Sequence, residues 1–179
     1  AFSVWLLVPY FLARVPGYTL TESGAILAAA AAGAVLAAPI GGRLVGRYVA
    51  AERLAIAGAA AIGGGLLLLS AWTEQTPTAL RVAGLVVQGV GLGLFQLAYS
   101  DIVAAALPLG DRGVAGSLAL LTRTLGTVTA ASIVLMVFDM LQPSHSFVEA
   151  FHRTFQLAAL LAFAAAGLLA FSSRKIGAS

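Results

Sequence analysis

The chain has 179 residues, of which 60% are hydrophobic and only 9% are charged, with a net charge of +3. A soluble domain carries about 25% charged residues, and a water-exposed protein of this length could not bury so much apolar side chain, so the excess is expected to face lipid. The ten basic residues are scattered between apolar runs, which excludes a nucleic-acid-binding patch, and the lack of cysteine excludes disulfides and thiolate chemistry.

Charged residues and prolines divide the chain into six apolar blocks, which predicts an all-α polytopic membrane helix bundle. Residues 1–13 are too short for a span of about 20 residues, so we expect the second half of a truncated helix in a chain cut from a longer protein. Further spans are expected at 23–44, 54–72, 80–107, 113–140 and 155–171. Short connections make consecutive helices antiparallel neighbours.

Two helix starts and one helix end carry local signals. Thr19 and Glu22 have the spacing of a capping box, in which each side chain satisfies a backbone N–H of the other residue. Thr76 and Pro77 predict an N-cap followed by proline at the first helical position. Trp72 is expected at the membrane interface, where tryptophan is enriched.

The basic residues of the loops favour one orientation in the membrane. Three of them fall on one side, Arg14, Arg81 and Arg153, and six fall on the other, Arg43, Arg47, Arg53, Arg112, Arg174 and Lys175. Because cytoplasmic loops carry an excess of Lys and Arg, the larger group and the C-terminus are expected in the cytoplasm.

Polar residues concentrate in the fourth and fifth spans, which are therefore expected to face a wet interior, while the third and sixth spans face lipid. At about 100° per residue, Gln88, Gln96 and Tyr99 share one helix face. We interpret this face, together with Thr127 of the fifth span, as the lining of a substrate path. The alternative is that the two glutamines hydrogen-bond across helices.

Asp101 and Arg123 are expected at similar depth in these two neighbouring antiparallel spans. One interpretation is an ion pair that latches the helices, and the other is that Asp101 takes up protons with Arg123 tuning its proton affinity.

Gly89, Gly91 and Gly93 lie inside an apolar helix with no preceding strand. Their spacing therefore indicates helix packing rather than a dinucleotide-binding motif.

The sequence contains no pattern that predicts catalysis. Asp101 has no second intramembrane carboxylate to form a protease pair, and Gly116-Ser117 lacks the nucleophile-elbow frame. His145 and His152 have no third ligand at metal spacing and are expected to be solvated. We therefore expect no enzyme, no metal and no cofactor.

Two patterns carry a resemblance to the major facilitator superfamily. The stretch Pro39-x-x-Gly42-Arg43-Leu44-x-x-Arg47 resembles its cytoplasmic Gly-x-Leu-x-Asp-Arg loop, with Gly46 at the usual Asp position and Val49 at a usual Gly position. The second pattern is similar to helices ten and eleven of the multidrug-efflux branch and comprises Gly89-x-Gly91-x-Gly93-x-Phe95-Gln96, Pro108, Asp111-Arg112-Gly113-x-Ala115-Gly116-Ser117 and Arg123-x-x-Gly126.

The resemblance implies the C-terminal six-helix half of a drug:proton antiporter, built from 3+3 inverted repeats, with the first, second, fourth and fifth spans lining a cavity. It implies that Arg123 is the family's membrane-embedded arginine and assigns four residues to cytoplasmic gating loops, Gly42, Arg43, Arg47 and Arg112. The implied partners are the lipid bilayer, a missing N-terminal six-helix half, a small-molecule substrate and protons.

We therefore expect a multi-pass protein of a plasma membrane, in bacteria the inner membrane, that exports small lipophilic or cationic molecules by alternating access driven by proton antiport. A small-solute proton symporter of the same fold is one alternative. A non-transporting membrane scaffold is the other.

Overall fold

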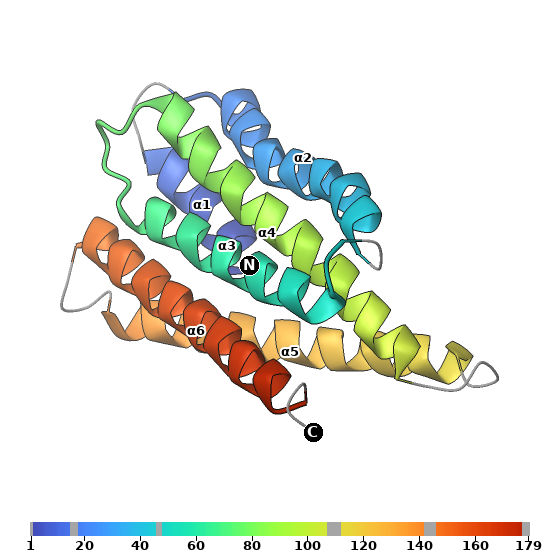
Figure 1. The fold of residues 1–179 in the computed structure, drawn as a ribbon. Coiled ribbons are helices and arrows are strands. Elements are labelled where there is room, and N and C mark those ends of the chain that lie inside the picture. Colours follow the sequence, from blue (N-terminus) through green and yellow to red (C-terminus); the bar gives the residue numbers. More distant parts are fainter. Residues whose placement is uncertain (1, 15–17, 46–47, 107–111, 142–145, 177–179) are drawn as a thin grey trace.

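The computed structural model describes residues 2–14, 18–45, 48–106, 112–141 and 146–176. The regular structure in these ranges consists of six α-helices, and each overlaps one range expected from the sequence. They are α1 (Phe2–Arg14), α2 (Leu20–Leu44), α3 (Ala51–Ser70), α4 (Thr78–Ala105), α5 (Arg112–Leu141) and α6 (Phe147–Ile176). Consecutive helices run up and down the bundle (Figure 1), and the expected all-α fold class is confirmed.

Five helices, α2 to α6, are long and apolar enough to cross a membrane. Their lengths, between 20 and 30 residues, match the roughly 20 residues that a helix needs to span the hydrocarbon core. The first helix, α1, is apolar but has only 13 residues. The chain is therefore a multi-pass membrane protein.

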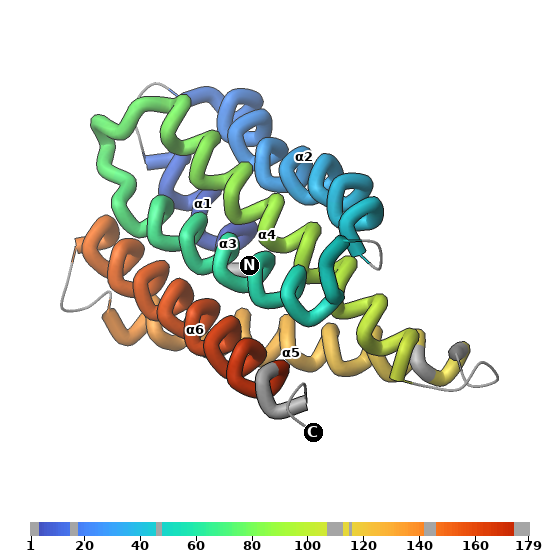
Figure 2. The backbone as a smooth tube through the Cα atoms, viewed as in Figure 1, coloured from blue at the N-terminus to red at the C-terminus, as the bar shows by residue number. Residues whose placement is uncertain are grey.

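Helix α3 occupies an enclosed position between α4 and α6, while α4 in turn packs along α2 (Figures 1 and 2). Half of the α3 span is buried, against 6% of the α5 span. α3 is thus the most buried of the five spans, because its residues are small: Gly58 and Gly65 allow α4 to approach closely, and Gly63 packs on the ring of Phe163 from α6. The expectation that the third span faces lipid stays a prediction, since half of that span is not covered by other helices of the chain.

The three alternating glycines of α4 pack against two different helices. A Cβ on Gly89 would lie 2.0 Å from the carbonyl oxygen of Ala30 in α2, and a Cβ on Gly91 would lie 2.6 Å from the backbone nitrogen of Ile62 in α3. Both distances are far shorter than a van der Waals contact, so only glycine fits. The predicted packing role of this pattern is confirmed.

The start of α2 is a capping box, as the sequence predicts. The backbone N–H of Glu22 donates to the hydroxyl of Thr19 at 3.3 Å, and the backbone N–H of Thr19 donates to the Glu22 carboxylate at 2.8 Å. Two N–H groups that would otherwise lack partners at the helix end are thereby satisfied.

The start of α4 differs from the expectation by one residue. The helix begins at Thr78, so Pro77 is the N-cap and provides no side-chain cap. The hydroxyl of Thr76 instead accepts a hydrogen bond from the backbone N–H of Thr73 at 2.8 Å. The polar group predicted to cap the helix is thus used to close the preceding turn.

An aromatic cluster fills the bundle where α3 ends and α6 begins. The ring of Phe151 lies 4.7 Å from that of Phe11, 4.5 Å from that of Phe155 and 6.4 Å from that of Trp72, measured between centroids. Trp72 is fully buried because α1 and α6 cover it, and its expected position at the membrane interface stays a prediction. His152 was expected to be solvated, but it is half-buried and its Nε2 hydrogen-bonds with the carbonyl oxygen of Trp72.

Candidate functional site

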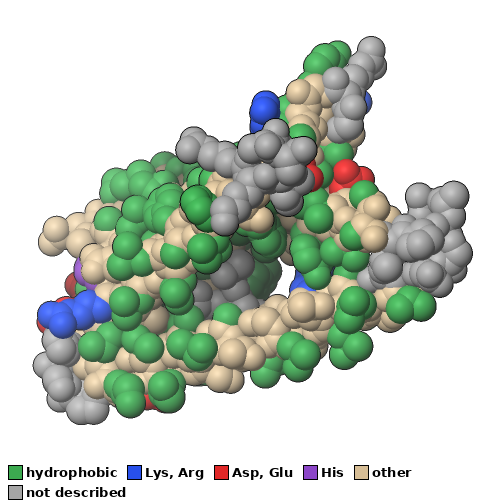
Figure 3. Space-filling view, turned by 60° about the horizontal axis from the view of Figure 1, so that its bottom comes forward, with side chains coloured by type: hydrophobic (Ala, Val, Ile, Leu, Met, Phe, Trp, Pro, Cys, Tyr) green, Lys and Arg blue, Asp and Glu red, His purple; other side chains and the backbone are tan. Residues whose placement is uncertain are grey.

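A pocket of about 280 Å³ lies between α4 and α5. Its described lining consists of Gln96, Tyr99, Ser100, Val103 and Ala104 from α4 and of Gly116, Ala119, Leu120 and Arg123 from α5. In the space-filling view hydrophobic side chains cover most of the visible face, and a hollow opens between parts of the molecule (Figure 3). The pocket thus has mostly apolar walls, into which Gln96, Tyr99, Ser100 and Arg123 bring polar groups.

The polar groups of α4 reach the pocket because of their helical spacing. Gln96 and Tyr99 are three residues apart, so their side chains lie on the same face, and Ser100 is one turn beyond Gln96. The hydroxyl of Ser100 donates to the carbonyl oxygen of Gln96 at 2.9 Å. The ring of Tyr99 is stacked on that of Phe95, with centroids 6.5 Å apart and planes 8° from parallel, which orients the phenol.

Arg123 provides the only charged group among the described lining residues. It lies eleven residues beyond Arg112, the first residue of α5, and therefore about 16 Å along the helix at 1.5 Å per residue. An arginine at such a depth is expensive in hydrocarbon and is normally found facing a partner or a water-filled cavity. Its place in the pocket satisfies this requirement.

Two of the residues predicted to line a path are placed elsewhere. Gln88 is buried at 1% exposure, its backbone and Cβ pack against Gly65 of α3, and its Nε2 has no hydrogen-bond partner. Thr127 lies one turn beyond Arg123 and its hydroxyl donates to the Arg123 carbonyl oxygen at 2.8 Å. The structure thus brings Gln96 and Tyr99 together with Arg123, and it separates Gln88 and Thr127 from the pocket lining.

The predicted Asp101–Arg123 ion pair is not formed, since the described residues contain no salt bridge between these two side chains. Asp101 is exposed and does not line the pocket. The reason is helix geometry, because Asp101 follows Tyr99 by two residues and so points about 200° away from it. Position 101 therefore lies outside the arc of α4 that lines the pocket.

The residues expected in gating loops are only partly described. Gly42 and Arg43 are exposed in the last turn of α2, where a cation is favourable near the helix C-terminus. Arg112 is the first residue of α5, but its side chain lies outside the described part of the chain, as does all of Arg47. His145 also falls outside it.

Arg81, which the sequence predicted as a loop cation, is buried instead. Its side chain is fully buried, and Nη2 donates to the carbonyl oxygens of Thr73 at 2.9 Å and Glu74 at 3.0 Å. The helical period could have predicted this burial. Arg81 lies four residues before Leu85 and seven before Gln88, and these three buried residues share one stripe of α4.

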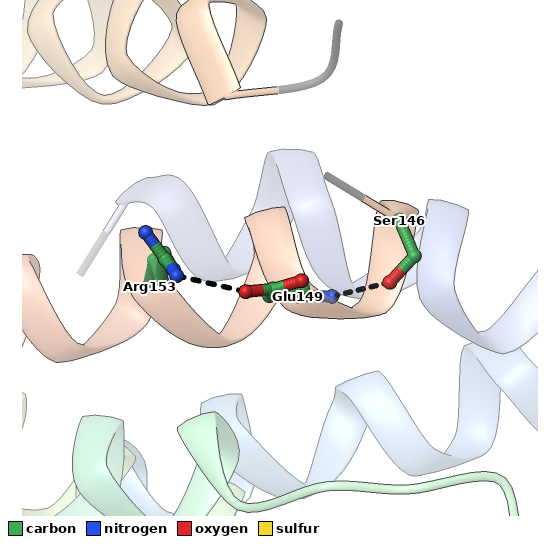
Figure 4. Close-up of polar contacts among 3 residues, drawn as sticks. All are labelled: Ser146, Glu149 and Arg153. Carbon is green, nitrogen blue, oxygen red and sulfur yellow. Dashed lines mark hydrogen bonds and ion pairs between the residues drawn. The ribbon is translucent and has the colours of Figure 1, made fainter. Parts of the chain in front are cut away.

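An ion pair at the start of α6 lies outside the pocket. Ser146 accepts a hydrogen bond from the backbone N–H of Glu149 at 3.2 Å, and Arg153 donates to the Glu149 carboxylate at 2.8 Å (Figure 4). Among the residues that the structure describes, no group of three or more His, Cys, Asp or Glu side chains is arranged to hold a metal ion.

The helices and the pocket define a class of protein. Apolar helices that span a membrane several times and enclose a pocket with polar groups and an intramembrane arginine are typical of a transporter. No protein-family model matches the chain. Curated proteins are nevertheless similar to it.

The chain is 26% identical over 130 residues to a tetracycline resistance determinant of Streptomyces rimosus, an alignment that covers 73% of this chain and 38% of the relative. It is 28% identical over 133 residues to the multidrug resistance protein Stp of Mycobacterium tuberculosis, covering 74% of this chain and 24% of the relative. It is 36% identical over 110 residues to an uncharacterised MFS-type transporter of the same organism, covering 62% of this chain and 16% of the relative.

These relatives confirm the resemblance to the major facilitator superfamily and its drug-efflux branch. The third relative is named as a transporter, which agrees with the expectation that the chain is not an enzyme, and each relative is longer than the segment matched here.

Proposed function

We propose that the chain is the C-terminal six-helix half of a secondary transporter that exports small lipophilic molecules in exchange for protons. Drug resistance is in the names of two relatives from different organisms, which supports export as the direction. The chain matches at most 38% of the length of these relatives, so the activity requires an N-terminal half as its partner. Alternating access between the two halves around a site at their interface is the mechanism.

The pocket between α4 and α5 is the observation that carries this proposal. A transported molecule has to leave water and enter a site inside the membrane, so the site needs apolar walls and a few groups that replace lost hydrogen bonds. Val103 and Leu120 provide such walls, while Gln96, Tyr99 and Arg123 provide donors and an acceptor. We propose Gln96 and Tyr99 as substrate-contacting residues.

We further propose that the ends of α2, α4 and α6 face the cytoplasm of a bacterial inner membrane. Arg43, in the last turn of α2, and Arg53, in the first turn of α3, are exposed cations of the described region that support this orientation. A C-terminal reporter that is active only in the cytoplasm, compared with one that is active only outside it, tests this orientation.

Transport by the full-length protein tests the proposed function. In everted membrane vesicles energised with a proton gradient, we expect the neutral dye N-phenyl-naphthylamine to accumulate, and a protonophore to abolish its accumulation. Replacing Gln96→Ala and Tyr99→Ala should lower the rate severalfold, because each removes a pocket side chain. The matched controls Gln156→Ala and Tyr10→Ala change exposed residues of α6 and α1 outside the pocket and should leave transport intact.

Two outcomes favour the alternatives. Accumulation that requires the opposite direction of the proton gradient would indicate a symporter. The absence of any gradient-driven accumulation would indicate a scaffold.

A further inference from the structure

The charge of the pocket selects the class of molecule that it takes. Arg123 is the only ionised side chain in its described lining, and this guanidinium has no ion-pair partner among the residues that the structure describes. Asp101, the nearest acid along α4, points away from the pocket. An uncompensated positive charge inside a membrane attracts anions and repels cations, because the low dielectric strengthens both effects.

From this geometry, and resting on the proposed function, we infer that the transporter accepts lipophilic organic anions, in which a carboxylate or sulfonate binds Arg123. A guanidinium presents paired N–H donors in a fixed plane that match the oxygens of such a group. Gln96 and Tyr99 add neutral donors beside it. The sequence left cationic substrates open, but the pocket disfavours them.

The rest of the pocket accommodates an aromatic body. Tyr99 is held flat by its stacking on Phe95, and Val103, Ala104 and Leu120 provide apolar walls. A volume of about 280 Å³ is just below the range for complete ligand sites, about 300–1,000 Å³, as fits a site that the other half completes. The ligand class is therefore an aromatic acid.

A pair of dyes that differ only in an acidic group tests the inference in vesicles of the full-length protein. Anilinonaphthalene sulfonate is an anion, N-phenyl-naphthylamine is its neutral counterpart, and ethidium provides a cation. We expect the anion to accumulate at least as fast as the neutral dye and ethidium to accumulate at least about tenfold more slowly, because a like charge in the site is unfavourable.

Variants of Arg123 separate binding from other roles. Arg123→Gln should lower accumulation of the anion about tenfold, as expected for the loss of a hydrogen bond to a charged group, with the neutral dye changed by less than about twofold. Arg123→Lys keeps the charge and should retain much of the anion transport. The matched control Arg153→Gln removes a charge from the exposed pair on α6 and should change none of the three.

Three results would overturn the inference. The first is a wild-type protein that exports the neutral dye but not the anion, which leaves the proposed function intact. The second is an Arg123→Gln variant that loses all three dyes equally, which makes the arginine a part of the fold or of proton coupling. In the third, the wild-type protein exports no dye at all, and the proposed function fails as well.

Discussion

Arg81 lies over the ring of Tyr18, with the guanidinium carbon 5.2 Å from the ring centroid. The same carbon lies 5.7 Å from the centroid of the Phe11 ring, and the hydroxyl of Tyr18 hydrogen-bonds with that of Thr78 in the first turn of α4. A buried cation is thus stabilised by two aromatic faces and by the backbone carbonyls of the α3–α4 turn. This arrangement ties α1 and Tyr18, two residues before α2, to the start of α4.

Arg81→Ala is expected to destabilise the full-length protein by about 2 kcal/mol or more, because it removes two hydrogen bonds from a charged donor and the stacking on two rings. Arg81→Lys should recover only part of this loss, since an ammonium lacks the planar fork. Thermal unfolding of the detergent-solubilised protein measures the effect. Arg153→Ala, in an exposed pair worth about 0–1 kcal/mol, is the control, and an equal loss in both variants would contradict the assignment.

Two neighbouring glycines of α3 should respond in opposite ways to the same substitution. A Cβ on Gly65 would lie 2.5 Å from the Cβ of Gln88 and 2.6 Å from its backbone nitrogen, whereas a Cβ on Gly64 would meet nothing within 4 Å. Gly65→Ala should therefore destabilise the protein by about 1–3 kcal/mol through overpacking. Gly64→Ala should be neutral or stabilise by up to about 1 kcal/mol through helix propensity. Melting temperatures that fall equally would show that the α3–α4 contact is not formed.

Thr19→Ala should destabilise the start of α2 by about 1 kcal/mol, the typical cost of losing an N-cap. Hydrogen exchange of the backbone amides of the first turn should increase, because the N–H of Glu22 loses its acceptor. Thr124→Ala is a suitable control, since the Thr124 hydroxyl only returns a hydrogen bond to its own helix, at the Leu120 carbonyl. Unchanged exchange in Thr19→Ala would contradict the cap.

The separation of Asp101 from Arg123 predicts that their substitutions act independently. In a double-mutant cycle with Asp101→Asn and Arg123→Gln, the interaction free energy for unfolding should be within about 0.5 kcal/mol of zero, as is usual for residues that share no contact. Thermal unfolding of the four proteins provides the measurement. A coupling well above 1 kcal/mol would restore the ion pair that the sequence predicted.

Several features could be predicted from the sequence because their causes are local. The apolar runs determine how many helices form and how long they are, since backbone groups in lipid have to be satisfied within the helix. The spacing of Thr19 and Glu22 specifies the cap, and the period of the helix places Gln96 and Tyr99 on one face. The alternation of Gly89, Gly91 and Gly93 indicates close packing on neighbouring helices, although not on which ones.

The partners of these helices were decided only in the tertiary structure. In a water-soluble protein a polar stripe shows which helix face is exposed, but the membrane-spanning helices here are apolar on nearly every side, so composition does not distinguish lipid from a neighbouring helix. Close approach at the glycines buried one face of α3 together with Gln88, and the direction of Asp101 leaves Arg123 as the one charged side chain in the described lining of the pocket. The sequence by itself therefore determined a six-helix membrane bundle with polar groups in α4 and α5, while side-chain shape between helices decided which of those groups share a site.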